Sequence, residues 1–182
     1  ALAQRLRAGG ATFVVRGVTG FELAGGRAQR VLTGEGPVET DTVVIAAGAH
    51  SNALSSQLGS EVPLETERGY HVMLASPSVQ PRIPTASGEG KYFATPMEGG
   101  LRIAGAVEFA GLAAPPNHDR ADVLLEGAKR LFPGLAHGSV ERWMGHRPSL
   151  PDSKPVIGRS PRAHNAFFAF GHGHVGLTGA PA

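Results

Sequence analysis

The chain has 182 residues, of which 41% are hydrophobic and 18% charged, so it has the apolar content of a folded protein and not that of a disordered one. Its formal net charge is +2, and Lys and Arg nowhere form a dense run, which excludes an obvious nucleic-acid-binding face. The absence of cysteine excludes disulfides, thiolate chemistry and cysteine-based metal sites.

No apolar run is long enough to span a bilayer as a helix, and no signal peptide opens the sequence. A soluble cytoplasmic protein without a transmembrane segment is therefore the default expectation. The 26 glycines and 14 prolines are scattered along the chain, which favours many short strands joined by tight turns.

The first fifty residues indicate the closing part of an α/β layer. Residues 1–7 have the pattern of the tail of a helix that ends at Gly9-Gly10, and residues 12–18 read as extended chain. Gly25-Gly26 separates two apolar segments, as in a β-hairpin. The continuous apolar run at 42–47 is typical of a buried parallel strand.

The rest of the chain is richer in strands. Residues 70–74, 92–95 and 101–107 are strand candidates, with a turn at 98–100, and further strands are expected at 140–144, 156–157 and 166–170. Residues 119–132 predict a helix whose apolar face contains Leu124, Leu125, Ala128, Leu131 and Phe132.

These elements predict an α+β fold with three parts. Residues 1–60 are expected to be the C-terminal part of an FAD-binding α/β layer. Residues 61–145 are expected to form an antiparallel-sheet substrate domain with one long amphipathic helix, and residues 146–182 a return segment to the first part. The chain begins without Met inside an expected helix and stops where another helix starts, so we expect it to be a fragment of a longer parent chain.

One candidate site is the glycine-rich run Gly171-His172-Gly173-His174-Val175-Gly176-Leu177-Thr178, which follows an apolar strand and precedes an expected helix. Glycines let the backbone approach a flat ligand closely, and the N–H groups of a helix start favour negative charge in front of them. A plain strand-to-helix turn explains the local pattern equally well.

A second candidate is Arg147, in the segment Gly145-His146-Arg147-Pro148. Pro148 biases Arg147 towards extended geometry, and a guanidinium held in this way suits a bidentate grip on a carboxylate. An exposed arginine in a proline-rich loop is the alternative.

Together the two segments resemble the C-terminal signature of the FAD-dependent D-amino-acid oxidase and dehydrogenase family. The resemblance rests on the pattern Gly-x-Arg-Pro-x-x-Pro-Asp-x-x-Pro-Val-Ile-Gly at 145–158, followed by a strand and Gly-His-Gly-His-x-Gly-x-Thr at 171–178. The segments 43–51 and 64–71 also resemble the family, so the likeness covers essentially the whole chain in order.

The resemblance implies that Arg147 binds the substrate carboxylate and that the backbone of residues 171–178 contacts the flavin of FAD. It also implies that Ala47 and Gly48 end a strand beside the cofactor, and that Val18 meets its adenine end. His174 stands where some relatives carry a second basic residue, and Tyr92 or Tyr70 is the candidate for a tyrosine over the substrate. The Gly-x-Gly-x-x-Gly loop for the cofactor phosphates is absent from the N-terminal half and is expected in the missing part of the parent chain.

Other chemistries have weaker support in the sequence. His172 and His174 lie two residues apart without a third ligand at a diagnostic spacing, so no metal site is expected. The alternating acids Glu61, Glu65 and Glu67 are more typical of a solvated face than of a hydrolase site. No Gly-x-Ser-x-Gly nucleophile motif occurs.

The expected function is oxidation of D-amino acids to 2-keto acids and ammonia by hydride transfer to FAD. A glycine or sarcosine oxidase and a 2-hydroxy-acid dehydrogenase of the same superfamily remain alternatives, as does a folded fragment without activity of its own. The amino-acid substrate, the electron acceptor and the oligomeric state are left open. The resemblance also allows a parent enzyme that is peripheral to the inner membrane.

Overall fold

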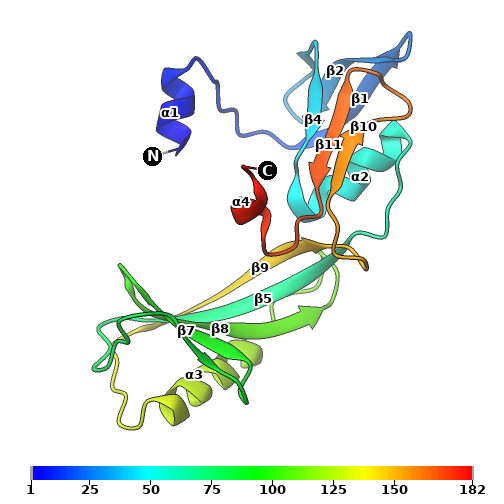
Figure 1. Cartoon of the computed structure of the whole chain (residues 1–182). Helices are drawn as coiled ribbons and strands as arrows, with labels where there is room; N and C mark the ends of the chain where they lie inside the picture. The colour runs from blue at the N-terminus through cyan, green and yellow to red at the C-terminus, as the bar shows by residue number, and fades with distance from the viewer. Residues whose placement is uncertain (1, 182) are drawn as a thin grey trace. The chain divides into compact units, whose positions relative to one another are not determined.

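The computed structural model describes residues 2–181 of the chain (Figure 1). The chain folds into two compact units. Unit 1 contains the residues up to 46 together with 51–62 and 157–169, and unit 2 contains 47–50, 63–156 and the residues from 170 onward. None of the helices in the described range is both long and apolar enough to cross a membrane.

Unit 1 begins with a short helix and a hairpin. Helix α1 (Leu2–Ala8) ends before Gly9, as predicted, but none of its residues is buried. Strands β1 (Val18–Ala24) and β2 (Arg27–Thr33) form the predicted antiparallel hairpin, and β3 (Val38–Glu39) pairs with β2. Gly25 and Gly26 have φ angles of 56° and 71°, the left-handed geometry that a two-residue hairpin turn requires.

A small second sheet in unit 1 has the strand order β10-β11-β4. Strand β4 (Val43–Ile45) pairs in parallel with β11 (Ala166–Phe170), and β10 (Val156–Arg159) lies on the other side of β11. The predicted parallel strand is therefore confirmed. It is covered less completely than the apolar run suggested, because Val43 and Ile45 are buried whereas Val44 is 59% exposed.

Asn165 joins the hairpin of unit 1 to this small sheet. Its side-chain amide donates to the carbonyl oxygens of Ala28 and Asp41, at 2.8 and 2.9 Å, and its Oδ1 accepts the backbone N–H of Ala28 at 2.8 Å. Between β4 and β5 the chain forms the short helices η1 (Gly48–His50), α2 (Ser51–Ser55) and η2 (Ser56–Leu58), which the sequence patterns do not predict.

Unit 2 is built on a five-stranded antiparallel sheet with the order β6-β7-β8-β5-β9. Its strands are β5 (Glu65–Leu74), β6 (Thr85–Ser87), β7 (Tyr92–Met97), β8 (Gly100–Phe109) and β9 (Val140–Ser149). Strand β9 extends through Pro148, which the sheet tolerates because β9 lies at its edge. The predicted domain boundary at 145/146 falls inside β9, because the strand continues to pair with β5 as far as Ser149.

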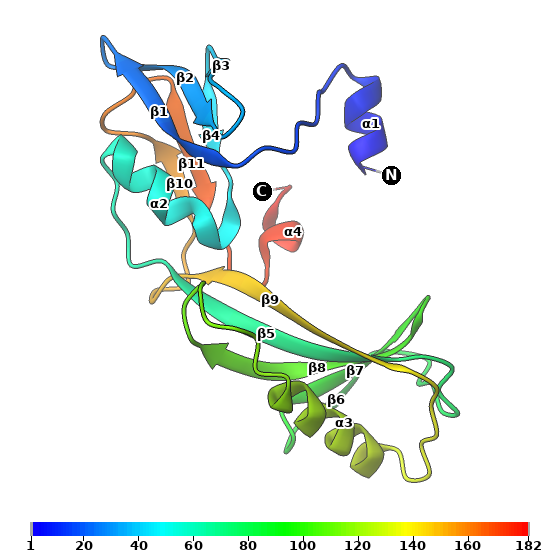
Figure 2. The ribbon, with the colours of Figure 1, turned by 180° about the vertical axis from the view of Figure 1, so that it is seen from behind.

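Helix α3 (Asp119–Leu131) covers one face of this sheet (Figure 2). Alternate residues of β5 and β8 point towards the helix and are fully buried, among them Val72, Leu74, Leu101 and Ile103. They pack with buried residues of α3, and Leu125, Leu131 and Phe132 of the predicted apolar face are partly buried against the same core. The α+β fold class is confirmed, with a short parallel sheet in unit 1 and an antiparallel sheet with one long helix in unit 2.

We predict that Leu124→Ala destabilises the chain by about 2–4 kcal/mol, because it leaves a cavity between α3 and the sheet. Leu124 is 4% exposed, whereas the neighbouring Val123 is 65% exposed. Val123→Ala is therefore the matched control, with an expected change below about 0.5 kcal/mol. Urea unfolding followed by circular dichroism measures both, and equal losses for the two variants would contradict the described packing of α3.

Candidate functional site

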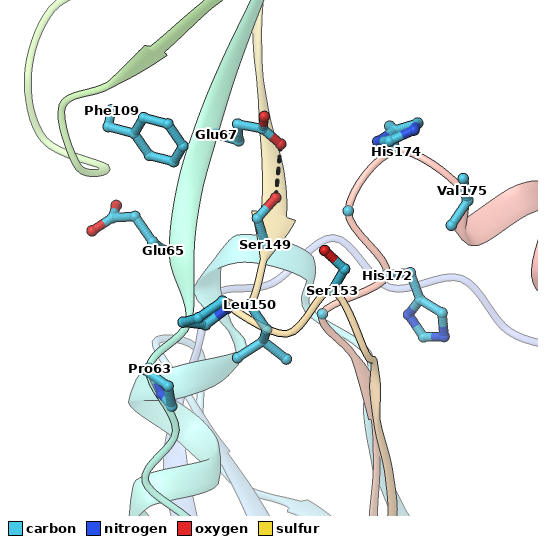
Figure 3. Close-up of a pocket in the computed structure, with 13 residues that line it drawn as sticks. Pro63, Glu65, Glu67, Phe109, Ser149, Leu150, Ser153, His172, His174 and Val175 are labelled. Carbon is cyan, nitrogen blue, oxygen red and sulfur yellow. Dashed lines mark hydrogen bonds between the residues drawn. The ribbon is translucent and has the colours of Figure 1, made fainter.

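A pocket of about 440 Å³ lies within unit 2. Three segments line it: the start of β5 with Pro63 before it, the end of β9 at Ser149 with the loop up to Ser153, and the turn 171–175 after β11. The ring of Phe109, at the end of β8, completes the lining. Figure 3 shows side chains of β5 and β9 on one side of the pocket and the 171–175 turn on the other.

The 171–175 turn needs glycine at two positions. Gly171 and Gly173 have φ angles of 80° and 55°, and a Cβ atom at Gly171 would lie 2.7 Å from Leu150 Cδ1. The N–H of Gly173 donates to the carbonyl of Pro148 at 2.8 Å, which attaches the turn to the end of β9. The two glycines therefore expose the backbone of the turn at the edge of the pocket, where larger residues would place side chains.

The turn also presents backbone donors. Among the described residues, no acceptor bonds the backbone N–H of His172 or of His174. A flat ring with carbonyl oxygens at its edge needs such donors together with a close approach to the backbone, so these residues fit the flavin that the sequence resemblance implies. The expected helix-dipole contribution is less well supported, because the described part of α4 comprises only Gly176–Gly179.

Two side chains on the sheet side of the pocket are already bonded to each other. Ser149 Oγ donates to a carboxylate oxygen of Glu67 at 2.9 Å (Figure 3). Glu67 lies directly opposite Arg147 in the β5–β9 ladder. No ion pair joins these two residues, however, so the carboxylate of Glu67 does not neutralise the guanidinium.

Arg147 lies on the face of the sheet opposite α3, which we call the helix-free face. It is formed by Glu67, Gly69 and His71 of β5, Val107 and Phe109 of β8, and Trp143, Gly145 and Arg147 of β9. The guanidinium of Arg147 lies over Gly69, where a Cβ atom would collide with its Cζ and both terminal nitrogens. The Arg147 side chain has no hydrogen bond or ion pair with any residue in the described range.

His71 and Trp143 form a stacked pair on the helix-free face, with ring centroids 4.8 Å apart and planes inclined by 25°. The Nδ1 atom of His71 is buried and has no hydrogen-bond partner in the part of the chain that the structure describes. Burial, together with the nearby positive charge of Arg102, lowers the pKa of His71 from 6.5 to about 4. The neutral imidazole is therefore the form that fits this stack.

The two candidate tyrosines lie on the other face of the sheet, towards α3. Tyr92 is 6% exposed and donates its hydroxyl to the carbonyl of Gly127 in the helix at 2.7 Å. Tyr70 is 1% exposed; its hydroxyl donates to Glu108 at 2.5 Å and accepts the N–H of Asn117 at 3.0 Å. This placement argues against our expectation that one of them covers the substrate, because both hydroxyls are occupied in the core.

The other predicted contacts are distributed over both units. Val18 begins β1 of unit 1, whereas Ala47 and Gly48 follow β4 and belong to unit 2. Gly48 has a φ angle of 56°. His174 and Val175 line the pocket, and the positions after them, Gly176, Leu177 and Thr178, lie in α4. Their roles towards FAD stay predictions.

The sequence patterns do not single out four residues of this region: Glu67, Ser149, His71 and Trp143. The alternating acids around Glu67 indicate a solvated face, and Ser149 occupies a variable position of the arginine motif. The available signal was alternation, because Trp143, Gly145, Arg147 and Ser149 occupy every second position of one strand and so share a face.

Comparisons with known proteins identify the family of the chain. The family described as "FAD dependent oxidoreductase" matches residues 1–182. A D-amino-acid oxidase of Bradyrhizobium diazoefficiens is 42% identical over 99% of this chain and 44% of its own length. D-amino acid dehydrogenase 2 of Mesorhizobium japonicum is 34% identical over 88% of this chain and 39% of its own length.

A solved structure, the glycine oxidase of Geobacillus kaustophilus, shares the fold with a TM-score of 0.80 and 22% identity. The match covers 94% of this chain and 46% of that one. The chain thus spans less than half the length of each of these three proteins.

We predict that His71 makes the folded chain less stable as the pH falls from about 6.5 towards 4. The pKa of His71 is lowered to about 4 in the folded chain, so in this interval the unfolded chain binds more protons and unfolding becomes easier. The contribution is complete above pH 6.5 and is lost as the pH drops. Denaturant unfolding at several pH values in this window measures the effect.

His71→Phe keeps an aromatic ring against Trp143 and should flatten the fall in stability. His118→Gln is the control, because His118 is exposed and makes no side-chain cap bond to α3. An unchanged slope in His71→Phe would contradict the assignment.

Proposed function

The chain belongs to the FAD dependent oxidoreductase family, and on this basis we propose that its protein oxidises D-amino acids. The products would be 2-keto acids and ammonia, with FAD, the cofactor of this family, as the primary electron acceptor. The proposal concerns the whole protein, because the chain spans 44% of the D-amino-acid oxidase to which it is similar.

The observation that carries the proposal is the state of Arg147. A guanidinium that is half-buried on a sheet face, without an anionic partner in the described range, is set up to receive a carboxylate. The competing carboxylate of Glu67 is bonded by Ser149. Every amino acid carries an α-carboxylate, so this cation supports an amino acid as substrate.

The chemistry assigns different tasks to two segments. Arg147 would fix the substrate by its carboxylate and thereby orient the neighbouring amine-bearing carbon. The glycine turn 171–175 would hold the flavin ring through its backbone N–H groups. FAD, when bound, supplies the capacity to accept a hydride from that carbon. The resulting imino acid hydrolyses in water, so the scheme requires no side-chain nucleophile.

The names of the relatives support a D-amino acid as substrate. The proteins at 42% and 34% identity are named for D-amino-acid oxidation and dehydrogenation. A glycine or sarcosine oxidase and a 2-hydroxy-acid dehydrogenase are the alternatives. Assays with D-amino acids, glycine, sarcosine and 2-hydroxy acids separate these alternatives. Formation of peroxide would identify oxygen as the final electron acceptor, and reduction of a quinone would identify the quinone.

A different alternative is that the 182-residue chain is a folded domain without activity of its own. We expect no turnover from the isolated chain, because the relatives that it matches are about twice as long. A purified chain that stays yellow after dialysis and oxidises a D-amino acid would overturn this expectation. The visible absorbance of bound flavin is the direct measurement.

We predict that Arg147→Ala in the flavin-loaded protein raises KM for a D-amino acid by roughly one to two powers of ten. This is the factor expected from the loss of a charge-assisted bond worth about 1.5–3 kcal/mol. Arg147→Lys should recover part of the loss, since it keeps the charge without the bidentate fork. Steady-state kinetics with the flavin content measured in parallel tests this, and the flavin content should stay unchanged.

Arg142→Ala is the matched control on the same strand. Arg142 forms an ion pair with Asp122 at 2.7 Å on the helix side of the sheet. The proposal predicts a nearly unchanged KM for this variant. An unchanged KM in Arg147→Ala would remove Arg147 from the substrate site.

A further inference from the structure

The helix-free face contains a pair of glycines beside the proposed carboxylate site. Gly69 of β5 and Gly145 of β9 lie directly opposite each other, and Val107 of β8 is the partner of Gly69 on its other side. The row across three strands is therefore Val107, Gly69 and Gly145. Of these three residues, only Val107 has a side chain, so the surface above β5 and β9 is open in this row.

Two long side chains occupy the space above the glycines. A Cβ atom at Gly69 would collide with the guanidinium of Arg147, and a Cβ atom at Gly145 would collide with the six-membered ring of Trp143. Cβ positions directly opposite each other in an antiparallel pair are about 5 Å apart. The guanidinium of Arg147 and the indole of Trp143 are therefore neighbours.

Apolar groups share the face with this guanidinium, and so does Arg102, whose pKa is lowered by burial and by the charge of Arg147. Trp143 is 47% exposed, and its ring is fixed from behind by the stacked imidazole of His71 at 4.8 Å. Val107 and Phe109 are also exposed, at 38% and 67%. An unpaired cation next to fixed apolar groups matches a ligand that has a carboxylate at one end and an apolar group at the other.

We propose that Trp143 and Val107 form a subsite for the substrate side chain next to Arg147, and that this subsite selects amino acids with an aromatic or large apolar side chain. The proposal rests on the proposed function, because it takes Arg147 as the carboxylate anchor. Trp143 and Val107 are specificity-determining residues in this scheme, and His71 is a positioning residue that holds the indole. Glycine would leave the subsite empty.

The test measures binding of carboxylates that are not oxidised. Acetate and phenylacetate differ by one aromatic ring, and their dissociation constants follow from the change in flavin absorbance of the flavin-loaded protein. We expect Trp143→Ala to weaken phenylacetate binding about tenfold or more, the effect of losing apolar contact with one ring, and to change acetate binding less than about threefold. Trp143→Leu should give an intermediate loss for phenylacetate. It keeps an apolar side chain at this position, so it tests the subsite even if the alanine variant does not fold.

A second readout does not depend on flavin. Trp143 is the only tryptophan of the chain, so its fluorescence reports directly on this position. Phenylacetate should change the emission of the chain at lower concentrations than acetate does. Phe93→Ala is the control for both readouts, because Phe93 is 57% exposed on the same face but lies on β7, separated from Trp143 on β9 by β8 and β5.

Three results would overturn the subsite. Equal losses for acetate and phenylacetate in Trp143→Ala would show that Trp143 only supports Arg147, and no loss for either would remove Trp143 from the site. Tighter binding of malonate than of phenylacetate would assign the face to a second carboxylate, because Arg102 lies beyond His71 on it. Failure of the proposed function is distinct, since Arg147→Ala would then leave the binding of both acetate and phenylacetate unchanged.

Discussion

The ladder between β5 and β9 determines which side chains meet in unit 2. Ten consecutive residue pairs join the two strands without a break in register. Three of these pairs lie on the helix-free face. Glu67–Arg147 places the guanidinium there, Gly69–Gly145 leaves space for long side chains, and His71–Trp143 forms the aromatic stack. A shift of one residue in either strand would turn its members of these pairs towards the helix and remove the arrangement as a whole.

Arg68 of β5 and Arg147 of β9 have opposite surroundings, because successive side chains of a strand point to opposite faces of the sheet. Arg68 is fully buried, donates to the carbonyls of Ala114 and Pro115 at 3.0 and 2.7 Å, and lies 3.5 Å from a carboxylate oxygen of Glu108. A buried charge requires such partners, so Arg68 attaches the loop before α3 to the sheet. Arg147 has no comparable partner in the described chain, and its guanidinium lies on the opposite face of the sheet.

Local patterns were sufficient for much of the fold. Gly25-Gly26 predicted the hairpin, and the spacing of apolar residues around Leu124 predicted α3, because both depend on neighbours in the sequence. The positions of Arg147 and of the glycine turn followed from motifs that are equally local. Helices η1, α2 and η2 were missed because they are short and have no apolar periodicity.

The remaining features depend on pairing between distant segments. The bond from Ser149 to Glu67 and the stack of Trp143 on His71 exist only because β9 pairs with β5 in one register. The direction of Tyr92 depends on which face of the sheet α3 covers, and no local pattern around it specifies that. The face of the sheet to which such a strand residue points is determined by its tertiary contacts.

The parallel pair β4–β11 has a consequence for the order of events during synthesis. Its two strands come from opposite ends of the chain, and the five strands and the helix of the antiparallel sheet are encoded between them. On the ribosome, β4 is therefore synthesised long before β11, and all strands of the intervening sheet precede β11 as well. The β4–β11 pair can therefore form only after residues 166–170 have been synthesised, when every strand of the antiparallel sheet is already available.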